Sequence, residues 1–345
     1  DPELHRDLVS LGMVKDLAVD GTTVRLKVEL TTPACPLKDA IGRDVKAALQ
    51  TAGFERVDLS WGSRVRSAPG VAQGTLTPGV KNIVLVGAGK GGVGKSTVAV
   101  NLSVALARLG AKVGILDADI YGPSLPMLTG ITEKPTSLDG QKLDPLRAHG
   151  IEVMSIGFLV DPEQALVWRG PMVTGALIQL LRDVRWGELD YLVLDLPPGT
   201  GDVPLTLAQN VTAAGVVLVS TPQDVALADV VRAKLMFDRV SIPVLGIVEN
   251  MSSFVCPHCR KETHIFAHGG ARAAAEKMGI RFLGEVPIDL AIREGGDHGV
   301  PIVAGAPDSP QSEAFLAVAR NVAGAVSTQV LKAPRLPVIG SQPIA

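Results

Sequence analysis

The feature that most constrains this chain is a glycine-rich string at residues 89–96, which reads Gly-Lys-Gly-Gly-Val-Gly-Lys-Ser. A short apolar run at residues 82–88 precedes it and has the pattern of a strand buried on both faces. Residues 97–109 then read as a helix, and Gly110 suits its C-terminal cap. Strand, tight turn and helix in this order predict a phosphate-binding loop. Glycines let backbone N–H groups converge on phosphate oxygens, and the helix adds its positive N-terminal end.

The string fits the pattern G-x-x-x-x-G-K-[ST], which assigns chemistry to individual side chains. We expect Lys95 to reach the β- and γ-phosphates of a nucleotide and the Ser96 hydroxyl to ligate Mg²⁺. A second lysine, Lys90, marks the deviant Walker A variant, which is typical of ATPases that work as dimers. A chance glycine-rich turn is the alternative, and the flanking strand and helix argue against it. The predicted nucleotide-binding residues of the loop are Gly89, Lys90, Gly91, Gly92, Val93, Gly94, Lys95, Ser96 and Thr97.

Three carboxylates and one amide stand where later strands are expected to end. Asp117 and Asp119 follow one apolar strand, and Asp195 ends another in the Walker B pattern. In an α/β sheet this edge faces the ligand crevice, so we expect these acids to serve Mg²⁺ and the attacking water, Asp195 through water. The alternative is that each aspartate only caps the next helix. Asn250 follows a further strand and is placed to contact the adenine edge, while the glycines of residues 196–202 suit a loop that senses the γ-phosphate.

Apolar strands alternate with helical stretches from Lys81 onward, which predicts an α/β fold with a doubly wound, mainly parallel sheet. The first part of the chain has its own pattern: a helix expected at residues 2–11, a hairpin, a second helix and a last strand. The predicted division is a small α+β domain at 1–62, a linker rich in Pro, Gly and Ser at 63–80, a nucleotide-binding domain at 81–330 and a flexible tail at 331–345.

Composition excludes several function classes. A net charge of −2 gives no reason to expect nucleic-acid binding. We see no apolar stretch that reaches the roughly 18–20 residues of a membrane span, and no signal peptide. Three cysteines do not make a disulfide framework, so we expect a cytoplasmic protein.

Cys256-Pro257-His258-Cys259 is the second informative element. Two thiolates at this spacing can face one soft metal or one edge of a cluster, but four ligands are usual for zinc or an iron–sulfur cluster. His264 and His268 could complete a zinc site, or the pair could be a redox dithiol. Alternatively, two chains could each donate a pair across a two-fold axis, which Lys90 favours independently. The remaining possibility is an unliganded pair in a turn.

Taken together, these residues resemble the Mrp/ApbC-type iron–sulfur cluster carriers, relatives of the MinD, ParA and nitrogenase iron-protein ATPases. The resemblance covers nearly the whole chain, and residues 1–62 resemble the SufT-like small domain of iron–sulfur assembly factors, with Thr32-Pro33-Ala34-Cys35-Pro36 as its cysteine motif. The position of Ala267 departs from the family pattern, which has glycine there. The motifs that match in order are the loop at 89–96, residues 116–124, Trp168-Arg169-Gly170-Pro171-Met172, residues 195–202, Glu249-Asn250-Met251-Ser252, the cysteine pair and residues 265–270.

The resemblance implies a homodimer that binds a bridging 4Fe-4S cluster through Cys256 and Cys259 of both chains. The dimer would exchange this cluster with cluster-assembly factors and apo-proteins. It also implies ATP and Mg²⁺ as cofactors and slow, switch-like hydrolysis. Lys90 would reach the nucleotide bound across the interface, and Asp119 would position the attacking water. Asp117 would lie nearer the metal. Lys90, Lys95 and Asp119 are therefore the candidate catalytic residues, and Ser96, Asp117 and Asp195 the candidate Mg²⁺ residues.

Two other interpretations remain open at the level of sequence. A ParA- or MinD-like positioning ATPase needs a basic DNA-binding face or a membrane-seeking terminal helix, and neither pattern is present. A zinc-stabilised regulatory ATPase would use His264 and His268. Cys35 precedes an expected helix, whose N-terminal end lowers a thiol pKa, so it is a candidate transfer thiol; a small buried apolar residue is the alternative.

Overall fold

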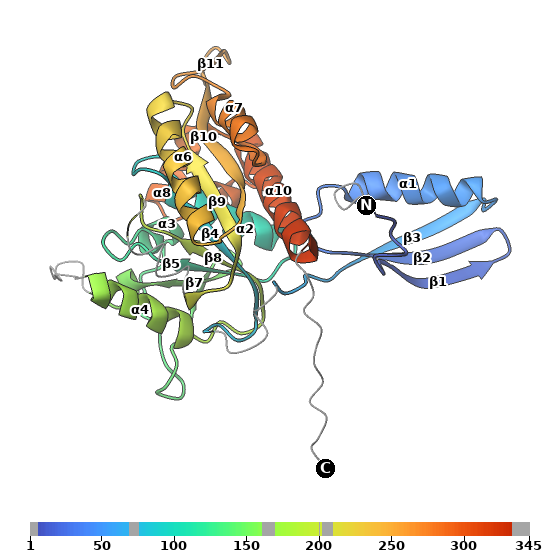
Figure 1. The fold of residues 1–345 in the computed structure, drawn as a ribbon, viewed down its shortest axis with the longest axis horizontal. Coiled ribbons are helices and arrows are strands. Elements are labelled where there is room, and N and C mark those ends of the chain that lie inside the picture. The colour runs from blue at the N-terminus through green and yellow to red at the C-terminus, as the bar shows by residue number, and fades with distance from the viewer. Residues whose placement is uncertain (1–5, 69–75, 161–169, 200, 202–209, 333–345) are drawn as a thin grey trace.

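The computed structural model describes residues 6–68, 76–160, 170–199, 201 and 210–332. These residues form two sheets, and Figure 1 shows the three-stranded one extending to one side of the nine-stranded one. We call the first sheet with its helix the small unit, and the second with its helices the large unit. The first two residues of the tail expected at 331–345 belong to the last helix, which ends at Lys332; residues 333–345 and the Trp168-Arg169 part of one motif lie outside the described residues.

The small unit is a sheet in the order β1-β2-β3 with one helix. β1 and β2 are antiparallel, whereas β2 and β3 are parallel and are joined through α1. Alternate residues of β2 are buried and form a core with Met13 and Ile41, as expected for a sheet with one covered face. The elements are β1 (Val14–Asp20), β2 (Thr23–Leu30), α1 (Lys38–Thr51) and β3 (Arg56–Ser63).

One prediction for this unit is wrong. Residues 2–11 were expected to form a helix, but residues 8–12 form turns. Leu8 and Leu11 pack against the small unit's core from these turns, and a ten-residue helix has little stability of its own because helix nucleation is costly.

The large unit confirms the doubly wound sheet. Its strand order is β11-β10-β9-β4-β8-β5-β7-β6, with β12 also paired to β10. All pairings are parallel except β6 with β7 and β10 with β11, which are antiparallel. The strands are β4 (Val80–Gly87), β5 (Val113–Asp117), β6 (Leu146–Ala148), β7 (Ile151–Ser155), β8 (Leu189–Asp195), β9 (Ala213–Ser220), β10 (Val244–Val255), β11 (Glu262–Thr263) and β12 (Phe282–Ile288).

The helices cover the sheet in two groups. From the centre of the sheet, the chain crosses from β4 to β5 in one direction and from β9 to β10 in the other, so right-handed crossovers place α2 and α6 on opposite faces. α10 packs against α2, and α6 packs against α7 (Figure 1). The helices are α2 (Lys95–Arg108), α3 (Leu125–Thr129), η1 (Ile156–Phe158), α4 (Gly170–Arg182), α6 (Asp224–Arg239), α7 (Gly270–Met278), α8 (Leu290–Asp297), α9 (Ile302–Gly305) and α10 (Pro310–Lys332).

Helix α10 corrects one expectation from the sequence. By length and composition it is apolar enough to cross a membrane, whereas the sequence was expected to contain no such stretch. The expectation counted uninterrupted apolar runs, and α10 mixes apolar residues with a few charged ones. Phe315, Val318 and Val322 of α10 are fully buried in the core of the large unit, as in the core helix of a folded domain.

Candidate functional site

The loop between β4 and α2 has the geometry that its glycines predict. Gly92 and Gly94 both adopt a φ of +79°, a conformation that favours glycine. A Cβ on Gly89 would lie 2.4 Å from the carbonyl carbon of Asp229 on α6, and one on Gly94 would lie 2.2 Å from the side-chain nitrogen of Asn250. The loop is therefore held in close contact with α6 on one side and β10 on the other.

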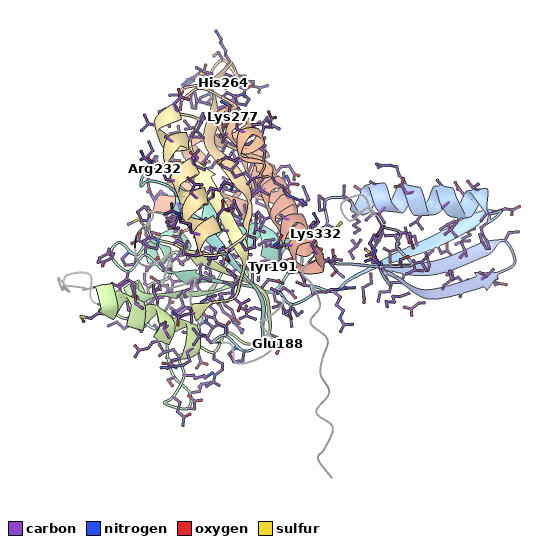
Figure 2. All side chains as sticks on the ribbon, in the orientation of Figure 1. Glu188, Tyr191, Arg232, His264, Lys277 and Lys332 are labelled. Carbon is purple, nitrogen blue, oxygen red and sulfur yellow. The ribbon has the colours of Figure 1, made fainter. Side chains whose placement is uncertain are left out.

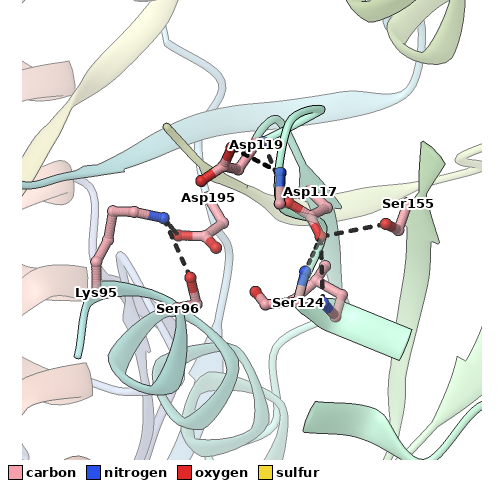
Figure 3. Close-up of polar contacts among 9 residues, drawn as sticks. Lys95, Ser96, Asp117, Asp119, Ser124, Ser155 and Asp195 are labelled. Carbon is pink, nitrogen blue, oxygen red and sulfur yellow. Dashed lines mark hydrogen bonds and ion pairs between the residues drawn. The ribbon is translucent and has the colours of Figure 1, made fainter. Parts of the chain in front are cut away.

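Lys95 and Ser96 begin α2 and face the end of β8 (Figure 3). The Lys95 ammonium donates to Asp195 Oδ1 at 2.5 Å and lies 3.1 Å from Ser96 Oγ. Only 7% of the Lys95 side chain and none of the Asp195 side chain is exposed. The ammonium therefore compensates a carboxylate that is fully buried, where an unpaired charge would be costly.

The second carboxylate oxygen of Asp195 fits a magnesium site. Among the described residues, Asp195 Oδ2 is buried and has no hydrogen-bond partner. A buried acceptor without a donor is costly, and waters bound to Mg²⁺ would supply donors. Ser96 is half-buried, and its hydroxyl contacts the same Lys95 ammonium as Asp195. These residues fit a Mg²⁺ ion held by the serine hydroxyl, with Asp195 acting through water.

Asp117 lies directly opposite Asp195 in the pairing of β5 with β8. Its Oδ2 accepts hydrogen bonds from Ser155 Oγ at 3.1 Å and from the backbone N–H groups of Ser124 and Leu125 at 2.9 and 3.1 Å (Figure 3). Burial, followed by the charge of Asp195, raises the pKa of Asp117 to about 7. Asp117 therefore holds the loop that leads into α3, which is the capping role that sequence left open as an alternative.

Asp119 is half-buried near the same strand ends. Its Oδ1 accepts from the Gly122 N–H at 3.3 Å. Burial raises its pKa, while the nearby Lys95 ammonium opposes that rise. The predicted acids are thus brought together at one edge of the sheet, around the start of α2.

Asn250 also contacts the phosphate-binding loop. Its side-chain nitrogen donates to the Val93 carbonyl at 2.8 Å. A cavity of about 440 Å³ opens beside it, large enough for a nucleobase, and is lined by Gly94, Thr97, Met251, Phe266 and Pro287 among others. The amide thus stands at the wall of this cavity, with its nitrogen fixed to the loop.

The predicted γ-phosphate loop lies against the phosphate-binding loop in its described part. The Gly199 N–H donates to the Ala88 carbonyl at 3.0 Å, and Gly199 has a φ of +92°. Pro198 is the nearest neighbour that a Cβ on Gly91 would meet, at 4.0 Å. Thr200 and Asp202 lie outside the described residues.

The cysteine pair occupies the turn of a hairpin formed by β10 and β11, at the end of the large unit away from α4 (Figure 1). The Arg260 N–H donates to the Cys256 carbonyl at 2.8 Å, and the Cys256 N–H donates to the Lys261 carbonyl at 3.0 Å, which closes the turn. Cys256 is half-buried, Cys259 is exposed, and neither they nor Cys35 form a disulfide. Backbone hydrogen bonds, first from Cys259 and then from His258, lower the pKa of the Cys256 thiol. The turn therefore favours a thiolate, the form that binds metals.

The proposed four-ligand zinc site is not assembled in the described residues. There, one group of three or more metal-ligating side chains has all its ligand atoms within 4.8 Å, and it contains neither Cys256 nor Cys259. His264 instead stacks on His268 with ring centroids 4.5 Å apart, and His268 Nε2 lies 3.0 Å from Glu285 Oε2. Figure 2 shows His264 close to the β11 end of the large unit.

Cys35 lies three residues before α1, in the small unit. It is half-buried and packs at the margin of the small unit's core. The neighbouring Thr32 hydroxyl accepts a hydrogen bond from Tyr191 of β8 at 3.1 Å, and Ala34 is buried in the core of the large unit. The cysteine motif is thus a segment through which the small unit contacts the large one, near Tyr191 (Figure 2), beside residues 65–68, which also pack into the large unit's core.

Sequence reasoning missed several residues of these sites. Ser155, which donates to Asp117, ends β7 at the same sheet edge. Its position at the end of an apolar run could have predicted that it lies near the other strand-end residues. Phe266 and Pro287 line the cavity but come from a loop and from β12, so no local pattern connects them to the loop at 89–96.

Comparison with known proteins gives two family matches. Residues 79–323 match the ParA model described as NUBPL iron-transfer P-loop NTPase, and residues 1–59 match a model described as iron–sulfur cluster assembly protein. An iron–sulfur cluster carrier protein of Deinococcus radiodurans is 51% identical over 333 residues, which is 96% of this chain and 93% of that protein. One of Escherichia coli is 51% identical over 95% of this chain and 89% of its own length.

Solved structures agree on the fold. A nucleotide-binding protein of Archaeoglobus fulgidus in complex with ADP is 42% identical with a TM-score of 0.60, and the match covers 69% of this chain and 92% of that protein. The cell-division ATPase MinD of Pyrococcus furiosus is 24% identical with a TM-score of 0.53, over 70% of this chain and 98% of its own, and shows the fold alone. The loop, the acids at the strand ends and these matches together show that the chain belongs to the NUBPL/ParA family of iron-transfer P-loop NTPases.

Proposed function

We propose that this chain is an iron–sulfur cluster carrier whose homodimer holds one 4Fe-4S cluster between the cysteine pairs of two copies. The observation that carries the proposal is the exposed turn with Cys256 and Cys259, which offers two thiolates where a 4Fe-4S cluster needs four. The relatives named iron–sulfur cluster carrier protein support the same cargo. The cluster is the substrate that the dimer passes to apo-proteins.

The nucleotide site supports a coupled ATPase. Lys95, Ser96 and Asp195 hold MgATP in the proposal, Asn250 contacts the base in the adjoining cavity, and Asp119 positions the attacking water. Lys90 reaches the nucleotide of the other copy. We expect slow hydrolysis, as in an ATPase that works as a switch. The division at residues 62 and 80, and the cytoplasmic location, stay predictions.

Anaerobic reconstitution with iron and sulfide tests the cargo. Wild-type protein should bind about four iron atoms per two chains, with a broad visible absorbance that four-thiolate clusters share. Cys256→Ser and Cys259→Ser should each abolish the cluster, whereas Cys35→Ser, the matched control, should keep it. Size-exclusion chromatography with light scattering should show the cluster in the dimer peak.

Three results would argue against the proposal. One is a full cluster on a monomer. Another is iron that survives the loss of Cys256. The third is stoichiometric zinc that depends on His264, which would favour the zinc-stabilised ATPase instead.

A further inference from the structure

Three metal-ligating side chains converge on β10 and β12, outside the sites described above. Glu249 and Glu285 are paired residues of these neighbouring parallel strands, and His268 immediately precedes the Gly269 that caps α7. Ligand atoms of the three side chains all lie within 4.8 Å of one another. Strand residues alternate between faces, so Asn250 points to the phosphate-binding loop while Glu249 points to the α7 side.

The protein balances the charge of this group only in part: the N-terminal end of α7 donates to Glu249, and His268 pairs with Glu285. Glu249 is fully buried and Glu285 is about 41% exposed. Within the described ranges, neither glutamate forms an ion pair with a lysine or an arginine. The one ion-pair partner there is His268, which pairs with Glu285. Two carboxylates at this separation repel each other, and a cation between them would remove that repulsion.

Glu249 is already oriented as a ligand. Its two oxygens accept hydrogen bonds from the Gly269 and Ala271 N–H groups at 2.9 and 2.7 Å. Each carboxylate oxygen keeps a further lone pair for another partner. Carboxylates that bind metals are commonly held by such hydrogen bonds, which fix the direction of the free lone pairs.

The backbone on either side of His268 adopts positive φ angles, which are strained for a residue other than glycine. Ala267 has a φ of +69°, which side chains other than glycine rarely adopt, and Gly269 has a φ of +75°. A strained backbone conformation persists only where the surrounding packing and hydrogen bonds hold it, and such residues are common at functional sites. The His264 ring stacks on His268 at 4.5 Å between centroids, which brings a second imidazole to the edge of the group.

We propose that Glu249, His268 and Glu285 bind one divalent transition-metal ion of the Zn²⁺, Fe²⁺ or Co²⁺ class. In a tetrahedral site, metal–ligand bonds of about 2.0–2.2 Å place ligand atoms about 3.3–3.6 Å apart, so His268 and Glu285 are already close enough and the widest pair must close by about 1 Å or more. An imidazole and two carboxylates suit these ions and exclude Cu(I), which prefers sulfur. The site is separate from the cysteine pair and does not depend on the proposed function.

Cobalt is the probe for this site, because its visible spectrum reports its ligands. We would titrate Co²⁺ anaerobically into full-length Cys256→Ser/Cys259→Ser protein, in which the hairpin thiols are absent. The expected result is one Co²⁺ per chain, with visible d–d bands and without a thiolate-to-cobalt charge-transfer band. In the same background, His268→Ala and Glu285→Gln should each weaken binding by about tenfold or more. Both side chains are about 41% exposed, so these variants should fold.

His298→Ala is the matched control, because His298 is an exposed histidine whose ring contacts only the Glu294 carbonyl among the described residues. It should bind Co²⁺ like its parent. The proposal is overturned if the double cysteine variant binds no Co²⁺, or if His268→Ala binds it with unchanged affinity and spectrum.

Discussion

Lys95 and Lys90 belong to one loop but have different surroundings. Lys95 is buried against Asp195, whereas Lys90 is half-buried and forms no ion pair among the described residues. Lys95→Ala would leave the Asp195 carboxylate uncompensated, and we expect it to lower the free energy of unfolding by about 3–5 kcal/mol. Lys90→Ala should change it by less than about 0.5 kcal/mol. Urea unfolding measures both.

The variants of Lys95 and Lys90 should also differ in whether they lose ATP binding or only ATP hydrolysis. Lys95→Ala should remove ATP binding, measured by calorimetry, whereas Lys90→Ala should retain binding and lose most of the hydrolysis rate. Equal loss of binding in both variants would contradict the role of Lys90 across the dimer interface.

Asp117 should make stability depend on pH. Folding raises its pKa from 3.8 to about 7, because the carboxyl is buried beside Asp195. The folded state therefore holds the proton more tightly. The stability that Asp117 contributes is complete below about pH 4 and is lost as pH rises toward about 7, by at most about 1.4 kcal/mol per pH unit.

Asp117→Asn removes this titration, and urea unfolding across that pH range checks it. The unfolding free energy of the variant, relative to wild type, should rise with pH. A constant difference would show that Asp117 does not titrate there. Ser155→Ala is the control, since it removes one hydrogen bond to Asp117 and keeps the carboxyl.

At this scale the sequence predicted which residues gather but not how they pair. The order of strand, loop and helix was enough to bring Lys95, Asp117 and Asp195 together, because parallel strands end at one edge. The bond between the Asn250 amide and the Val93 carbonyl depends on a contact between segments 157 residues apart. No local pattern encodes such a contact.

Among the elements, the phosphate-binding loop and α6 approach each other closely, backbone against backbone. Gly89→Ala would place a Cβ 2.4 Å from the Asp229 backbone, so the loop or the helix must shift. We expect a loss of about 1–3 kcal/mol in unfolding free energy. Gly91→Ala is the matched control, since its Cβ meets nothing closer than 4.0 Å and its φ is not positive. Equal melting temperatures for the two variants would contradict this account.

Long elements were predictable and short ones were not. Buried parallel strands such as β8 and β9 are continuous apolar runs with a clear signal. β6 and β11 have three and two residues, too few to show an alternation of apolar and polar residues in the sequence. Asn250 was expected to follow a strand, but it lies within β10, which continues to Val255 because its far half pairs with β11 and β12.

At the scale of the whole molecule, the segment from Thr32 to Ala34 connects the two units. Ala34 is 2% exposed and lies in the large unit's core, and Tyr191 donates to Thr32. Ala34→Arg would put a long charged side chain into that contact, so we expect the units to separate and the radius of gyration from X-ray scattering to increase. Ala48→Arg, on an exposed position of α1, should leave it unchanged. An unchanged radius for Ala34→Arg would show that this contact does not hold the units together.

Strand β10 carries Asn250, which contacts the phosphate-binding loop, and ends at Val255, directly before Cys256. At about 3.3 Å per residue the segment from Asn250 to Cys256 spans at most about 20 Å, and the positive φ of Met251 shortens that distance. A tilt of about 5° at the loop would move the cysteine end of such an arm by up to about 2 Å. In the proposed dimer, the β10 strands of the two chains are related by a two-fold axis, so the distance between their cysteine pairs would change by twice that amount. The spacing of the four sulfur atoms, and with it the grip on a cluster of fixed size, would then report which nucleotide each loop holds.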